Sequence, residues 1–172
     1  QAARIALENM TPVILLTDTY LANGTGLWRI PRLADLPPIL PSAEWVHAGE
    51  EGKMYRNMGL EHDALTGTIS TDPANHQRMV NRRAAKVAAV KVPNVVVQGN
   101  PDSDLLLVGW GSTEGHLKEV AEELNCALAH FNYIHPLPAN TADVLKNYKR
   151  VVVCELNKGQ FATLLQAAVP DV

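Results

Sequence analysis

The amino-acid sequence predicts an α/β fold with a parallel sheet, and three observations point to it. Strand-sized apolar runs in the second half of the chain lack the alternation of a half-exposed strand, which is typical of strands buried on both faces. Stretches with apolar residues at helical spacing lie between these runs. Turn-forming residues separate the two patterns. Strands that alternate with helices form parallel sheets with right-handed crossovers.

The elements of this second half follow one another closely. The expected strands cover residues 94–98, 104–109, 127–134 and 150–156. The expected helices run from the turn after residue 109 to about Leu124, from Asn140 or Thr141 to about Asn147, and from Gly159 to Val169.

The first half of the chain is less regular. Residues 2–10 contain helix formers with one apolar face, and the apolar run 13–16 is expected to be a strand buried on both faces. Further on, Asp72 followed by Pro73 predicts a helix start, because aspartate accepts hydrogen bonds from the first turn and proline fits the first helical position. We expect this helix to reach about Val92, where the next proline stops it.

Residues 21–71 show no periodicity and contain ten glycines and prolines. A structureless stretch of this length is uncommon inside a compact domain. Its aromatic residues, Trp28, Trp45 and Tyr55, argue against a solvated linker, because disordered segments are poor in aromatics. We therefore expect the segment to be ordered against another surface, with a plain linker or a functional loop as the alternatives.

The composition excludes two classes of partner. With 172 residues, 47% of them hydrophobic, the chain can bury one core, or form one domain and part of another. The formal net charge is -3 and no basic stripe is present, so nucleic acid is not an expected partner. No apolar run approaches the roughly 20 residues of a membrane span, so no membrane association is expected.

The two cysteines, Cys126 and Cys154, lie on separate apolar segments without C-x-x-C spacing. We expect two buried, reduced thiols and a cytoplasmic protein, with a disulfide or a metal site as the alternative. The six histidines are scattered and form no H-x-x-x-H pair, so no residue is expected to bind a metal.

Residues 109–113 read Gly-Trp-Gly-Ser-Thr, follow a buried strand and open a helix. Free N–H groups at a helix start attract anions, and glycines let an anion approach closely. Gly109, Gly111, Ser112 and Thr113 are therefore a candidate anion-binding turn, although the motif is neither G-x-G-x-x-G nor a Walker loop. The alternative is a tight turn in which Ser112 or Thr113 caps the helix.

Glu61, His62 and Asp63 place an imidazole between two carboxylates. A carboxylate near an imidazole can prepare it for acid–base chemistry. Consecutive residues rarely converge on one atom, however, so a solvated loop or an interface is the favoured alternative. No catalytic residue is assigned.

Polar residues also follow two of the expected strands. Asp18 and Asn23 follow the first strand, and residues 155–160 follow the last. Ligands gather at the carboxyl edge of open α/β sheets, whereas turns with satisfied side chains explain the same residues without a ligand.

Five segments, in this order, carry a resemblance to a known family: ILLTDTYLANGTGLWRIP, GLEHDALTG, DPANHQRMVNRRAAKV, DLLLVGWGST and VVVCELNKGQ. Together they resemble the α subunits of thiamine-diphosphate-dependent 2-oxoacid:ferredoxin oxidoreductases, most closely the 2-oxoglutarate type. The resemblance spans nearly the whole chain. Each motif is only moderately specific, but five in order are highly specific.

The resemblance implies a domain organisation. Residues 1–18 would be the end of a pyrimidine-type thiamine domain, 19–92 a crossover with one helix, and 93–172 a domain like the carboxy-terminal domain of transketolase. In the family this last domain continues further, and both ends of the present chain look truncated. The fold class implied is thus a parallel-sheet, transketolase carboxy-terminal-like α/β domain preceded by the tail of another domain.

The resemblance also implies a function. The family oxidatively decarboxylates a 2-oxoacid, here most closely 2-oxoglutarate, to an acyl-CoA and reduces ferredoxin. The β subunit would hold thiamine diphosphate, magnesium and an iron–sulfur cluster, and no segment here matches the family's cofactor-contacting glutamate. We therefore expect an isolated chain without activity and with a structural, subunit-interface role. The candidate interface residues are Asn23, Trp28, Arg29, Glu61, His62 and Asp63.

Two alternatives stay open. The chain could be the carboxy-terminal domain of another thiamine enzyme, of the transketolase or pyruvate dehydrogenase type, but such enzymes lack the LANGTGLWRIP and GLEHD segments. It could instead be a non-catalytic module that binds an anion or a nucleotide at residues 109–113.

Overall fold

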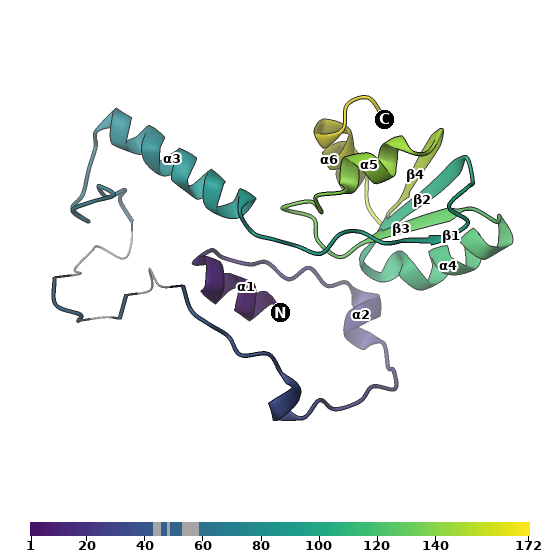
Figure 1. The fold of residues 1–172 in the computed structure, drawn as a ribbon, viewed down its shortest axis with the longest axis horizontal. Coiled ribbons are helices and arrows are strands. Elements are labelled where there is room, and N and C mark those ends of the chain that lie inside the picture. Colours follow the sequence, from purple (N-terminus) through teal and green to yellow (C-terminus); the bar gives the residue numbers. More distant parts are fainter. Residues whose placement is uncertain (43–45, 48, 53–58) are drawn as a thin grey trace. The chain divides into compact units, whose positions relative to one another are not determined.

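A computed structural model describes the chain except residues 43–45, 48 and 53–58 (Figure 1). The chain forms two compact units. We call residues 1–15 with 29–90 the helical unit, and residues 16–28 with 91–172 the sheet unit.

The sheet unit contains a four-stranded sheet in the order β1-β3-β2-β4. The strands are β1 Val97–Gly99, β2 Leu105–Trp110, β3 Ala127–Phe131 and β4 Arg150–Cys154. β2 runs parallel to both β3 and β4, which confirms the predicted α/β class. β1 pairs antiparallel with β3, contrary to the expected all-parallel sheet. The connection from β1 to β2 is too short for a parallel crossover, which needs about a dozen residues or more.

Helices cover both faces of this sheet (Figure 1). They are α4 Glu114–Glu123, α5 Thr141–Lys146 and α6 Gln160–Ala168, and a short 3-10 turn, η2 Gly111–Thr113, precedes α4. Alternate residues of β2 enter opposite cores: Leu107 packs with α4 residues, whereas Leu106 and Val108 pack with residues of α5 and α6. This arrangement explains why the β2 sequence is apolar without alternation.

The larger core, on the α5 and α6 face, is centred on aromatic residues. Phe131 at the end of β3 is 1% exposed, and its ring lies 5.2 Å from that of Phe161 in an edge-on arrangement. Trp110 at the end of β2 lies 6.1 Å from Phe161, measured between ring centroids. These contacts join the carboxyl ends of two strands to the first turn of α6.

The helical unit contains α1 Ala2–Asn9, η1 Leu33–Asp35 and α3 Pro73–Ala88. α3 begins where the sequence predicts, because the Asp72 carboxylate accepts hydrogen bonds from the amides of Ala74 (3.2 Å) and Asn75 (3.0 Å). It ends at Ala88, earlier than expected. Val92 is not helical, because helical backbone is unfavourable for a residue that precedes a proline. The Lys86 ammonium donates to the Met10 carbonyl at the end of α1 (3.2 Å).

The expected buried strand at residues 13–16 is wrong for this chain. No described residue forms a strand ladder with it, and Ile14 is 83% exposed and Leu15 74% exposed. An apolar run predicts burial, but a strand also needs neighbouring strands for its backbone groups, and the described residues supply none. After it, Asp18 caps a short helix, α2 Thr19–Asn23, within the sheet unit.

Candidate functional site

The turn that follows β2 is closed by its own residues. The Thr113 hydroxyl accepts a hydrogen bond from the Trp110 amide (3.1 Å) and donates to the Trp110 carbonyl (2.8 Å). Gly111 has φ +63°, a left-handed conformation that favours glycine. A Cβ atom on Gly109 would lie 2.3 Å from Leu117 Cδ1 and 2.6 Å from Thr113 Oγ1. The two glycines therefore serve the backbone conformation and the close packing of α4.

A carboxylate of the same chain lies at the predicted anion-binding turn. Asp18 Oδ2 accepts hydrogen bonds from the Ser112 amide (3.3 Å) and from the Ser112 hydroxyl, and Oδ1 accepts from the Leu21 amide (2.9 Å). The Ser112 hydroxyl, followed by the Leu21 amide, holds the pKa of Asp18 below its ordinary value of 3.8. The turn therefore binds an anionic group, and that group is an internal one. An external anion would have to displace it.

The interface candidates Asn23, Trp28 and Arg29 differ in their surroundings. The Asn23 side chain donates to the Thr19 carbonyl (2.9 Å) and so closes α2. The Tyr20 ring packs edge-on against His116 of α4, with 5.8 Å between ring centroids. Trp28 is 75% exposed and Arg29 is also exposed. All three residues are thus exposed, and the Asn23 side chain already hydrogen-bonds within α2.

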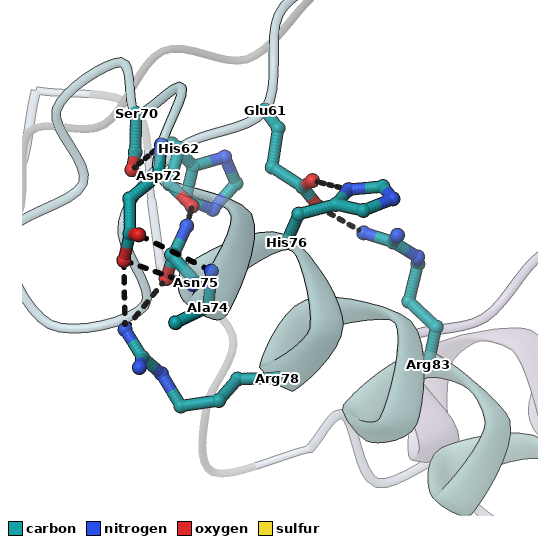
Figure 2. A network of polar contacts seen from close by, with 9 residues as sticks. All are labelled: Glu61, His62, Ser70, Asp72, Ala74, Asn75, His76, Arg78 and Arg83. Atoms are coloured by element: carbon teal, nitrogen blue, oxygen red, sulfur yellow. Dashed lines mark hydrogen bonds and ion pairs between the residues drawn. The ribbon is translucent and has the colours of Figure 1, made fainter.

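In the helical unit, Glu61 joins its loop to α3 (Figure 2). Its carboxylate accepts from Arg83 Nη1 (2.7 Å) and contacts His76 Nδ1. The Arg83 guanidinium, with His76 as the second cause, holds the pKa of Glu61 below its ordinary value of 4.5. The histidine that pairs with this carboxylate is therefore His76 on α3, which no motif in the sequence distinguishes from the other histidines.

Neighbouring residues of the same loop face other partners. The backbone of His62 bridges to Ile69, and its carbonyl accepts from the Asn75 side chain (3.0 Å), which is 1% exposed (Figure 2). Asp63 Oδ1 accepts from the amides of Leu65 and Thr66, both at 2.9 Å. The Thr66 amide, followed by the Leu65 amide, lowers the pKa of Asp63 below 3.8. The three adjacent residues thus stabilise the loop and its attachment to α3, and they do not converge on one point.

Glu155, just after β4, caps α6 from outside the helix. Its carboxylate accepts from the amides of Phe161 (3.0 Å) and Ala162 (3.1 Å) and from the Trp110 indole (3.2 Å). Burial raises the pKa of Glu155, but these hydrogen bonds together outweigh that effect and leave the pKa below its ordinary value of 4.5. The Glu155 carboxylate is therefore hydrogen-bonded within the chain. Residues 155–160 thus form a turn, as the alternative to a ligand site predicts.

We expect Glu155→Gln to destabilise the sheet unit by about 1–2 kcal/mol at neutral pH, because a charged acceptor becomes a neutral one with a single oxygen. A carboxyl whose pKa is lowered on folding stabilises above its unfolded pKa, and this stabilisation is lost as pH falls through the folded pKa. The difference between wild type and variant should therefore shrink below about pH 4.5. Urea unfolding, followed by the NMR signals of the β2 amides, measures this difference in stability. Glu119→Gln, at an exposed position of α4, is the control. An equal difference at pH 7 and pH 3.5 would show that the Glu155 carboxylate does not stabilise α6 through its charge.

Comparison with known proteins places these features in a family. No protein-family model matches the chain. It is 39% identical over 191 aligned residues to the 2-oxoglutarate oxidoreductase subunit KorA of Mycobacterium tuberculosis, and that alignment covers 96% of this chain. The chain belongs to the family of 2-oxoacid:ferredoxin oxidoreductase α subunits.

Two further members of this family support the assignment. The α subunit of 2-oxoacid:ferredoxin oxidoreductase 1 from Aeropyrum pernix is 29% identical over 91% of the chain. The 2-oxoglutarate:ferredoxin oxidoreductase structure from Magnetococcus marinus, with 2-oxoglutarate, coenzyme A and succinyl-CoA bound, matches with a TM-score of 0.62 and 29% identity. This match covers 76% of the present chain and 24% of that one. These relatives favour the oxidoreductase family over the transketolase and pyruvate dehydrogenase alternatives.

The chain spans about 29% of the length of the curated relatives that it matches, and it matches a carboxy-terminal fragment of the α subunit. Among the described residues, no group of three or more histidine, cysteine, aspartate or glutamate side chains could hold a metal ion. Nor does any helix in the described ranges have the length and apolar character that a membrane crossing requires.

Both cysteines are free thiols. Cys126 is 1% exposed, as expected, whereas Cys154 at the end of β4 is only partly buried, contrary to expectation. Burial raises the pKa of both thiols. Cys154 is less covered because β4 is the outermost strand of the sheet, with β2 on one side only.

Proposed function

We propose that this chain is a structural and subunit-interface part of a thiamine-diphosphate-dependent 2-oxoacid:ferredoxin oxidoreductase. The observation that supports this most is its 39% identity to a 2-oxoglutarate oxidoreductase subunit over 96% of its length. In the proposed reaction the bond between the carboxylate and the carbonyl carbon of 2-oxoglutarate breaks and carbon dioxide leaves. The acyl group passes to the sulfur of coenzyme A, the thiol proton is released, and two electrons pass singly to ferredoxin.

The cofactors of this reaction belong, in our proposal, to the β subunit. Two cysteines cannot supply the four thiolates that an iron–sulfur cluster normally needs. Four carboxylates of the described loops, Asp18, Glu61, Asp63 and Glu155, already accept hydrogen bonds from groups of this chain. These residues therefore do not fit a magnesium diphosphate, and we derive no catalytic step from them. The proposed location of the complex is cytoplasmic.

The proposed domains follow the family. Residues 1–18 would end a pyrimidine-type domain, 19–92 would form the crossover, and 93–172 would form the transketolase-like domain. The exposed apolar side chains of residues 13–16 support the first boundary, because such a run would find neighbouring strands in the preceding domain. The two cores on the faces of the four-stranded sheet support the last domain.

A chimaera tests the proposed activity. We expect that the Mycobacterium tuberculosis subunit KorA, with its matching part replaced by this chain, still supports ferredoxin reduction that depends on 2-oxoglutarate and coenzyme A when it is assembled with its partner. The chain alone should give no turnover and bind no thiamine diphosphate in calorimetric titration with magnesium. A chimaera that assembles but has lost the activity would contradict the proposed function, whereas pyruvate-dependent activity would change only the substrate.

The crossover is, in our proposal, the interface part. Several apolar side chains of its described residues are exposed in this chain: Leu27, Trp28, Ile30, Leu33, Leu36 and Leu40. Exposed apolar residues in such number mark a surface that another protein covers. Trp45 and Tyr55, which contribute to the prediction from sequence, lie outside the described residues.

Limited proteolysis measures this coverage. Trypsin should cut after Arg29 and Arg32 rapidly in the isolated chain, because both residues are exposed. In the assembled enzyme we expect the cleavage rate at these two sites to fall at least about tenfold, since proteolysis follows the population of open backbone. The bond after Arg150, within β4, is the internal control and should resist in both states. Equal rates in both states would show that the segment is a plain linker.

A further inference from the structure

His130 is a buried histidine whose two ring nitrogens have different surroundings. It lies on β3, pairs in register with Gly109, and its side chain is 4% exposed. Nε2 lies 3.1 Å from the Gly111 carbonyl oxygen. A carbonyl oxygen only accepts, so Nε2 carries a hydrogen and the neutral ring keeps a lone pair on Nδ1. Among the described residues Nδ1 has no hydrogen-bond partner.

The group that faces this lone pair is the carboxylate of Glu114, the first residue of α4. Glu114 Oε2 lies 3.9 Å from His130 Nδ1, too far for a hydrogen bond, and Oε1 accepts from the Lys118 ammonium (2.8 Å). The Lys118 ammonium holds the pKa of Glu114 below its ordinary value of 4.5, so this carboxylate is charged at neutral pH. Two acceptors therefore face each other with no proton between them.

The other elements around His130 add little charge. β1 contributes the Gln98 amide, which hydrogen-bonds Glu114, and β2 contributes Gly109. The turn contributes the Gly111 carbonyl, beyond which lies the Asp18 carboxylate, already bound by Ser112. Among the described residues, the charged group that lies beside the ring is thus the Glu114 carboxylate, which Lys118 pairs with, while Asp18 is bound to Ser112 of the same turn.

We propose that His130 and Glu114 form a proton-sensitive switch at the start of α4. When Nδ1 takes a proton from solvent, the contact of two acceptors becomes an ion-paired hydrogen bond, which joins β3 to the first residue of α4. The same ring still holds the Gly111 carbonyl through Nε2. Protonation therefore fixes the turn that carries Ser112 and its contact with Asp18.

The sign of the effect follows from the charges. With the proton on Nδ1, Glu114 attracts the ring, and without it the two acceptors gain nothing from each other. The contribution of Glu114 to stability is therefore larger in mildly acidic than in alkaline solution. This contribution is lost again when Glu114 itself is protonated. That protonation occurs below about pH 4.5, because the pKa of Glu114 is lowered.

Nitrogen NMR of the histidine rings in the full chain tests the switch directly. In alkaline solution we expect His130 to show the Nε2–H tautomer. On acidification Nδ1 should take up the proton, and Glu114→Gln should lower its proton affinity about threefold to tenfold. Glu122→Gln, the same charge change on an exposed residue of α4, is the matched control and should leave the affinity unchanged.

Three outcomes would overturn the proposal. One is an Nδ1–H tautomer in alkaline solution, and another is an equal effect of Glu114→Gln and Glu122→Gln on His130. The last outcome concerns urea unfolding, followed on the β3 amides. The proposal requires that Glu114→Gln loses more stability at pH 5.5 than at pH 8.5. A loss that is the same at both values would show that Glu114 acts only through Lys118.

Discussion

Phe131→Ala is expected to destabilise the sheet unit by about 3–5 kcal/mol, the range found when a fully buried phenylalanine is truncated. Phe131 is 1% exposed and packs on Phe161 with 5.2 Å between ring centroids. Its removal leaves a cavity beneath the first turn of α6, and the rigid β3 backbone, paired on both sides, cannot close it. A cost of this size is a large share of the stability of a typical domain.

Hydrogen exchange of the β2 and β3 amides in the full chain measures this loss, because these central strands open only with the whole sheet unit. Leu156→Ala is the control, since Leu156 is 81% exposed and its truncation should change the free energy of unfolding by less than about 0.5 kcal/mol. A loss below about 1 kcal/mol for Phe131→Ala would mean that the ring does not fill this core.

Gly109→Ala is expected to destabilise the sheet unit by about 1–3 kcal/mol through overpacking. The new methyl group would lie 2.3 Å from Leu117 Cδ1 and 2.6 Å from Thr113 Oγ1. Neither neighbour can move freely, because Leu117 is 7% exposed and the Thr113 hydroxyl is bound to Trp110. We therefore expect α4 to shift away from the sheet and the contact between Asp18 and Ser112 to weaken.

Gly115→Ala is a matched control for this prediction. Gly115 lies within α4, and a Cβ atom there would meet nothing within 4 Å. Alanine in a helix is favoured over glycine by roughly 0.5–1 kcal/mol, so this variant should be as stable as wild type or more stable. Thermal and urea unfolding of both variants give the comparison. A Gly109→Ala protein as stable as Gly115→Ala would show that the close approach of α4 is not needed.

The amino-acid sequence by itself predicts the α/β class of this protein and the order of the helices and strands in its sheet unit. The apolar run of β2 predicts a strand covered on both faces, and the two cores around Leu106 and Leu107 confirm it. Asp72 before Pro73 predicts the start of α3, and the carboxylate accepts the amides expected of a helix cap. Five motifs in order are enough to recognise the family. All of these signals are local, because each depends on neighbouring residues or on a short period along the chain.

Only the tertiary structure decides which distant groups meet. Asp18 lies 94 positions before Ser112, and Glu61 pairs with His76 and Arg83 on another element, so no spacing rule predicts either contact. The antiparallel direction of β1 depends on the strand beside it and on the length of its connection to β2. The exposed run at residues 13–16 has the composition of a buried strand, but burial also requires a covering surface. Composition sets the tendency of a segment to be buried, whereas the presence of a partner surface decides whether it is.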